Sequence, residues 1–157
     1  MRVWRITRRP YRALDGEGAR LGGGRWNSEG VPVVYASASL SLAALEYLAH
    51  LEIEDAPRDL VTMEIDVPDD IRIEEMGASD LPKGWRTTHD HPACLALGDQ
   101  WAREGRALAL KVPSALIPEE SSVLLNPVHP EMRRVRVVST RPFAFDPRLL
   151  PRRQLPR

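Results

Sequence analysis

Short alternating or continuous apolar runs, separated by turn residues, dominate this chain and predict more strands than helices. No strand–helix–strand alternation repeats along the sequence, so we expect an α+β domain and not a doubly wound sheet. The expected strands are residues 2–6, 31–36, 60–67, 107–112, 122–125 and 135–140, with shorter ones near Ile71 and at 143–145.

One segment after the second expected strand carries the three-to-four-residue periodicity of an amphipathic helix. Residues 40–51 place their apolar side chains on one stripe, and Ser37 or Ser39 is the candidate N-cap. Glu46 lies near the polar margin of that stripe, a position that suits either a surface carboxylate or a carboxylate facing a cleft.

A second helix is expected at about residues 91–104, with Asp90 or Thr88 as its N-cap. Residues 7–24 are rich in arginine and glycine, and residues 69–85 are interrupted by glycine and proline. We expect both of these segments to be loops.

Length and composition fit a single domain with one core. The chain has 157 residues, of which 43% are hydrophobic and 28% charged. We expect residues 1–150 to form one compact domain with a mixed or antiparallel sheet flanked by helices, and the Pro- and Arg-rich residues 151–157 to fray. No long apolar run is present and the first residues are typical of a strand, so neither a membrane span nor a signal peptide is expected.

Charge and cysteine content narrow the possible functions. The 22 basic and 22 acidic residues cancel, whereas a dedicated nucleic-acid binder carries a basic excess. Cys94 is the single cysteine and lies among apolar residues, which favours a buried thiol in a reducing cytoplasm. The cysteine and the four histidines form no zinc motif, so no metal site is expected.

The segment from Gly22 to Leu48 holds the candidate site. Arg25 follows three glycines, Tyr35 ends an apolar run, and Glu46 lies in the expected helix. Glycines let a backbone approach a ligand closely, and a guanidinium group binds phosphate through its planar fork. If the strand and helix pack together, the three side chains converge on one cleft. Considered singly, each is better explained as a turn, surface or core residue.

Other polar residues give weaker signals. Ser114 follows a proline in VPSAL, without the G-x-S-x-G pattern of a nucleophile elbow, and is typical of a turn. No Ser-His-Asp arrangement, kinase motif or Rossmann fingerprint can be assembled from the chain.

Five motifs lie along almost the whole chain: VWRI, GGRWNSEGVPVVYAS, SLAALEYLAHLEI, LKVPSALIPEESSVLLNPVHPE and RPFAFDPRLL. Together they resemble the RES domain, a family named for an arginine, a glutamate and a serine and found as the toxin half of bacterial toxin–antitoxin pairs.

The resemblance implies a fold similar to that of ADP-ribosyltransferases and a site that binds NAD. The family's arginines fall on Arg5 and Arg25, which would hold the diphosphate, and its tyrosine on Tyr35, beside nicotinamide. The family's glutamate falls on Glu46, which would stabilise positive charge on the ribose.

The family's serine falls most naturally on Ser114 and an asparagine on Asn126, both implied to position nicotinamide or ribose. Relatives often carry Asn-Tyr ahead of LLNP, where this chain has Ser122-Val123. That departure leaves Ser121 and Ser122 as alternatives for the serine.

The resemblance implies a cytoplasmic bacterial toxin that cleaves the nicotinamide–ribose bond of NAD by hydrolysis or phosphorolysis, with NAD as substrate and no resident cofactor. Transfer of ADP-ribose to a protein is the second hypothesis, and a non-catalytic partner-binding domain is the third. The implied partner is an antitoxin similar to Xre-like helix-turn-helix proteins. Contact with DNA would then belong to that partner, and a homodimer would be compatible with the family.

Overall fold

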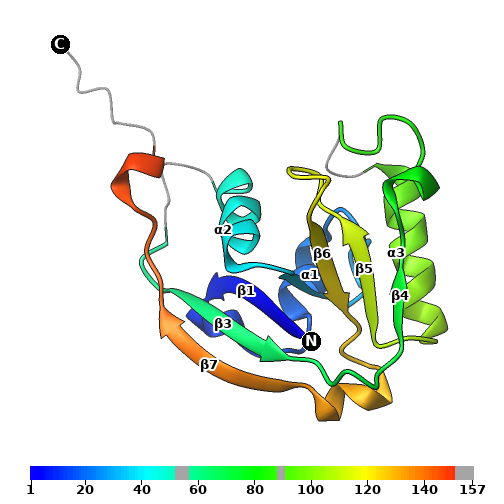
Figure 1. Ribbon diagram of the computed structural model, residues 1–157, viewed down its shortest axis with the longest axis horizontal. Helices are drawn as coiled ribbons and strands as arrows, with labels where there is room; N and C mark the ends of the chain where they lie inside the picture. Colours follow the sequence, from blue (N-terminus) through cyan, green and yellow to red (C-terminus); the bar gives the residue numbers. More distant parts are fainter. Residues whose placement is uncertain (52–56, 88–90, 151–157) are drawn as a thin grey trace.

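Seven strands form one mixed sheet in the order β4-β5-β6-β2-β1-β3-β7 (Figure 1). The computed structural model describes residues 1–51, 57–87 and 91–150. Neighbouring strands are antiparallel except β4 and β5, which are parallel. The strands are β1 (Arg2–Arg8), β2 (Val34–Ser37), β3 (Leu60–Asp66), β4 (Ile73–Glu75), β5 (Ala109–Pro113), β6 (Ser121–Leu125) and β7 (Arg136–Pro142).

Three α-helices accompany the sheet in the described part of the chain: α1 (Glu17–Gly22), α2 (Leu40–Ala49) and α3 (Pro92–Glu104). Figure 1 shows α2 above the β1–β3–β7 half and α3 beside the β4–β5–β6 half. Short 3₁₀ turns lie at Arg9–Tyr11, Ala78–Asp80, Pro130–Arg134 and Pro147–Leu149. Within the described residues, no helix is long and apolar enough to cross a membrane.

The sheet is weakly joined at its middle. β1 pairs with β3 along its whole length, from Arg2 opposite Asp66 to Arg8 opposite Leu60. The same strand pairs with β2 only where Trp4 lies opposite Ser37. Beyond this point the two strands are no longer paired, so the sheet opens between its two halves.

Each half of the sheet has its own helix and its own core. Side chains of α3 pack on β5 and β6, in a cluster that includes Cys94, Trp101, Leu110 and Leu124. On the other half, α2 packs on β1 and β3 in a cluster that includes Ile6, Ala43 and Leu60. A third cluster on β1, β3 and β6 joins the halves through residues such as Val3, Met63 and Val123.

The expected α+β domain, its mixed sheet and most of its elements are confirmed. Ser39 is the N-cap of α2 and accepts the Leu42 N–H at 3.1 Å. Cys94 is buried, as expected from its apolar surroundings. The proposed caps Thr88 and Asp90 lie outside the described residues; the structure has His91 as the N-cap of α3. The tail, residues 151–157, also lies outside them.

Two local predictions were wrong. The expected loop 7–24 contains α1, whose glycines gave no sign of a helix in the sequence. Arg20 donates two hydrogen bonds to Glu17, and Asp15 accepts the Glu17 N–H; these contacts hold the helix. The short strand expected near Ile71 is confirmed as β4, which begins at Ile73 because Ile71 closes a turn onto Pro68.

The strand expected at 143–145 does not form. β7 ends at Pro142, and Phe143 and Phe145 instead make an edge-to-face aromatic pair 4.9 Å apart. Phe145 also lies against Tyr47 of α2, with ring centroids 6.1 Å apart. The aromatic side chains of this segment thus pack on α2 and do not extend the sheet.

Candidate active site

A cavity of about 730 Å³ lies where the sheet opens, a size typical of small-molecule sites. Its walls come from β1, β2, α2, the end of β5 and the segment between α1 and β2. The cavity therefore touches both halves of the sheet. Four of the predicted site residues line it: Arg5, Arg25, Tyr35 and Glu46.

The glycine-rich segment brings Arg25 to the cavity. Gly23 ends α1 with a positive φ of 66°, which favours glycine, and its N–H donates to the Ala19 carbonyl. A Cβ on Gly24 would lie 2.6 Å from the Tyr35 hydroxyl, too close for any other residue. Arg25 Nη1 donates to the Trp85 carbonyl at 2.8 Å, which fixes the direction of the guanidinium group.

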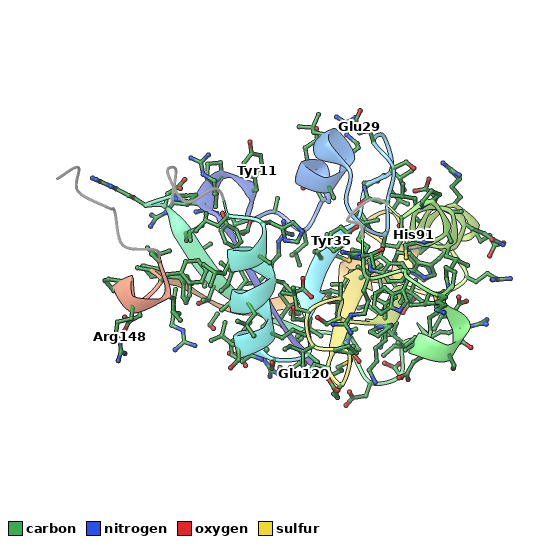
Figure 2. The ribbon with its side chains drawn as sticks, turned by 90° about the horizontal axis from the view of Figure 1, so that it is seen from above. Tyr11, Glu29, Tyr35, His91, Glu120 and Arg148 are labelled. Atoms are coloured by element: carbon green, nitrogen blue, oxygen red, sulfur yellow. The ribbon has the colours of Figure 1, made fainter. Side chains whose placement is uncertain are left out.

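Tyr35 holds this segment in place through its hydroxyl. The hydroxyl donates to Asn27 Oδ1 at 2.7 Å and accepts the Trp26 N–H at 3.0 Å. Burial raises the pKa of Tyr35, so the hydroxyl remains a donor at neutral pH. Figure 2 shows Tyr35 near the centre of the molecule, with Tyr11 and Glu29 further out.

Helix α3 supports the same segment from behind. A Cβ on Gly98 would lie 1.8 Å from the Trp26 carbonyl oxygen, so only glycine permits this approach. The next residue, Asp99, is buried and accepts the Ser28 N–H at 2.9 Å. Asn27 is fully buried, and its amide donates to the carbonyls of Ala19, Ser28 and Val31.

Arg5 reaches the cavity from β1. Its Nη1 is buried and has no hydrogen-bond partner among the described residues. Burial lowers the pKa of Arg5, which the negative charge of Asp15 partly offsets. An unsatisfied buried guanidinium nitrogen is costly, and an anionic or carbonyl group of a ligand would satisfy it.

Glu46 is held by Ser114. The Ser114 hydroxyl donates to Glu46 Oε1 at 2.6 Å and accepts the N–H groups of Leu116 and Ile117, both at 3.1 Å. These three bonds use the full capacity of a hydroxyl. Ser114 is buried and does not line the cavity, so the geometry makes it a support for Glu46.

The structure does not bring Asn126 to the cavity. Its amide donates to the Ala102 carbonyl at 2.8 Å, and its Oδ1 accepts the Val128 N–H at 3.2 Å. Ser122 does line the cavity, whereas Ser121 does not. Of the three candidate serines, Ser114 is the one bonded to the predicted glutamate.

Sequence reasoning missed several residues of the cavity. Tyr11 and Tyr47 line it, as does His50, whose Nδ1 lies 2.7 Å from the Glu46 carbonyl oxygen. Glu46 and His50 lie four positions apart at the end of α2, and this spacing is the signal that was available, since residues four apart share a face.

The cavity thus combines two guanidinium groups, a held carboxylate and aromatic rings. This set suits a ligand that carries both an anionic group and a polar, flat or sugar-like part. In the described residues, no group of three or more His, Cys, Asp or Glu side chains is placed to hold a metal ion.

Several known proteins are similar to this chain over almost its whole length. The family model described as "RES domain" matches residues 2–146. The chain is 39% identical over 153 residues to a "Prs ADP-ribosylating toxin" of Sphingobium sp. (strain YBL2), covering 94% of this chain and 95% of that protein. It is 34% identical to a "Toxin Res" of Photorhabdus laumondii, covering 96% and 97% of the two chains.

Among solved structures, the fold is similar to a chain in the "MbcT-MbcA toxin-antitoxin complex" of M. tuberculosis. The TM-score is 0.74, the identity 21%, and the alignment covers 90% of this chain and 83% of that one. At this identity the likeness establishes the fold.

Proposed function

The chain belongs to the RES domain family, and from that premise we propose that it is the toxin of a toxin–antitoxin pair and that it cleaves the nicotinamide–ribose bond of NAD. One observation carries the proposal: a single cavity collects Arg5, Arg25, Tyr35 and Glu46, from four separate parts of the chain. NAD offers the two kinds of group this cavity suits, a diphosphate and hydroxylated riboses with flat bases.

The two arginines would bind the diphosphate. Arg25 is oriented by its bond to the Trp85 carbonyl, and Arg5 carries a buried nitrogen that a phosphate oxygen would satisfy. Tyr35 would pack beside nicotinamide with its ring, because its hydroxyl is already bonded to Asn27 and Trp26.

Glu46 would act on the ribose. As the bond between nicotinamide nitrogen and C1′ breaks, its electron pair leaves with nicotinamide, which departs neutral, and positive charge develops on the ribose. Ser114 holds Glu46 Oε1, and Oε2 would hydrogen-bond a ribose hydroxyl and stabilise that charge. An acceptor oxygen then bonds to C1′ and releases its proton. Water or phosphate as acceptor would deplete NAD.

A protein acceptor is the second candidate, and one observation favours it. The relative with 39% identity is named for ADP-ribosylation. The same cavity and the same bond cleavage would serve both reactions, which differ only in what attacks C1′. We keep NAD degradation as the first proposal and transfer as the alternative.

The partner would be a separate antitoxin, because the similar M. tuberculosis chain belongs to a toxin–antitoxin complex. We propose that this antitoxin is Xre-like and contacts DNA itself. The toxin, as a monomer or a homodimer, would work in the bacterial cytoplasm, where its substrate NAD is found.

The test incubates purified protein with adenylate-labelled NAD, with and without phosphate, and identifies the products by mass. Nicotinamide release with label in ADP-ribose or its phosphate supports degradation. Label on a macromolecule supports transfer. Arg25→Ala and Glu46→Ala should each abolish nicotinamide release while leaving the fold intact by circular dichroism. Intact NAD under every condition, with cell extract as acceptor, contradicts both candidates.

A further inference from the structure

Arg86 does not line the cavity, yet its side chain binds the backbone that holds Ser114, the residue that supports Glu46. It belongs to the segment between β4 and α3, and its side chain is exposed. Its Nε donates to the Ala115 carbonyl at 2.8 Å, and its Nη2 to the Leu116 carbonyl at 3.4 Å. One guanidinium group therefore caps two successive carbonyls.

The same two peptide groups face Ser114 with their other ends. The Ala115 carbonyl and the Leu116 N–H belong to one planar peptide unit, and the Leu116 carbonyl and the Ile117 N–H belong to the next. Both N–H groups donate to Ser114 Oγ at 3.1 Å. Arg86 thus binds the acceptor end, and Ser114 the donor end, of the same pair of peptides.

Arg86 is also joined to the opposite wall of the cavity. Its own N–H shares a peptide unit with the Trp85 carbonyl, which accepts Arg25 Nη1 at 2.8 Å. The Trp85 ring packs on Trp26, with centroids 6.2 Å apart. A continuous path therefore runs from Arg25 through Arg86 and Ser114 to Glu46.

We propose that Arg86 is a positioning residue that orients Glu46 through Ser114 and keeps Glu46 and Arg25 in register across the cavity. The role in the reaction rests on the proposed NAD cleavage. A cation at a peptide carbonyl polarises the peptide and strengthens its N–H as a donor, and chains of such bonds reinforce one another. The two strengthened N–H groups fix Ser114 Oγ, so its own proton is directed at Glu46.

A planar fork is needed for this arrangement. Lysine offers one compact ammonium group and cannot cap two carbonyls in the same way. We therefore expect Arg86→Met to lower kcat for nicotinamide release about tenfold, since small misplacements of a reacting group are costly, and Arg86→Lys to restore only part of it. KM should change less than kcat, because Arg86 does not itself line the cavity.

Arg136 provides a matched control. It is likewise exposed, and its Nη1 also donates to backbone carbonyls, those of Arg133 and Val135, but it lies on β7 and does not line the cavity. Arg136→Met should leave kcat within about twofold of wild type, as is usual for a surface change.

A double-mutant cycle separates positioning from a general loss of packing. If Arg86 acts through Ser114, then Arg86→Met should lower kcat much less in a Ser114→Ala background than in the wild type. If Arg86→Met and Ser114→Ala lower kcat by factors that multiply in the double variant, the proposal is overturned. Equal losses of kcat in Arg86→Met and Arg136→Met would overturn it as well.

Amide hydrogen exchange tests the relay without any activity. In Arg86→Met the Leu116 and Ile117 amides should exchange up to about tenfold faster, the loss expected for one weakened hydrogen bond. In Arg136→Met they should exchange as in the wild type. Unchanged exchange in Arg86→Met refutes the relay, whereas faster exchange in a protein that leaves NAD intact refutes the proposed function alone.

Discussion

Two walls of the cavity differ in how fully their charged groups are hydrogen-bonded: the α2 wall, which carries Glu46, and the β1 wall, which carries Arg5. On the α2 wall, Glu46 Oε1 already accepts the Ser114 hydroxyl, which is itself bound by two backbone N–H groups. On the β1 wall, Arg5 Nη1 is buried without a partner among the described residues. The carboxylate is held by protein groups alone, whereas the guanidinium group of Arg5 retains an unsatisfied donor.

This difference matches two tasks. A group that stabilises charge developing in a transition state works best when it needs no reorganisation. A group that binds the ground state gains most when the ligand accepts from a donor that the protein itself leaves without a partner. We therefore expect changes on the α2 wall to act on kcat and changes on the β1 wall to act on binding and on stability.

The largest effect is expected for Glu46→Gln. The amide keeps the size of the side chain and can still accept the Ser114 hydroxyl, but it carries no negative charge to stabilise the ribose. We expect kcat for nicotinamide release to fall about 100- to 1,000-fold, the usual cost of losing such a contact, with little change in KM. Steady-state kinetics on purified protein measures both constants.

Glu104→Gln is the control for this change. Glu104 pairs with Arg106 at 2.6 Å at the end of α3 and does not line the cavity. Its loss should leave kcat as in wild type. A Glu46→Gln variant that raises KM and spares kcat would reverse the division between the two walls.

A smaller effect on turnover, and an opposite one on stability, is expected for Arg5→Met. Methionine fills much of the same space without a buried cation, and replacing a poorly compensated buried charge by an apolar group is often stabilising. We expect KM for NAD to rise about tenfold, as for the loss of one charged hydrogen bond, and kcat to change less. The melting temperature should stay level or rise.

Arg2 is the matched control on the same strand. It is exposed and pairs with Glu64 and Asp66 at 3.3 and 3.4 Å. Arg2→Met should leave KM unchanged and should not raise the melting temperature. If Arg5→Met unfolds the protein at a lower temperature, the buried guanidinium group has a partner that stabilises it, and the contrast between the walls is lost.

Site residues that lie close together in the sequence could be predicted, whereas a contact between residues far apart in the sequence could not. Arg25, Tyr35 and Glu46 lie on three successive elements, so their convergence follows from packing one strand on the next helix. Glu46 and Ser114 are 68 positions apart, and no local pattern shows that one would donate to the other. The resemblance indicated the serine, but its contact with Glu46 came only from the structure.

Residue type alone also does not distinguish a residue that supports the site from one that contacts the ligand. Ser114 and Asn126 were both expected beside the ligand, and both are buried and hydrogen-bonded to protein groups. Helix α1 was hidden for a related reason: three of the seven residues 16–22 are glycines, which have low helix propensity, and the Glu17–Arg20 pair offsets this only in the folded chain. Tertiary contacts decide such cases.

The smallest effect on catalysis is expected for Tyr35→Phe, which tests whether the Arg25 segment depends on the Tyr35 hydroxyl. The change leaves Trp26 N–H and Asn27 Oδ1 without the partner they share, at a cost of about 1–3 kcal/mol in the free energy of unfolding. The Arg25 segment should loosen, so KM should rise by about threefold, with kcat nearly unchanged because the ring remains. Chemical denaturation and steady-state kinetics measure the two effects.

Tyr11→Phe is the stability control, since Tyr11 is 45% exposed. Equal stability of the two variants would show that Asn27 and Trp26 find other partners, and that Tyr35 contributes its ring alone.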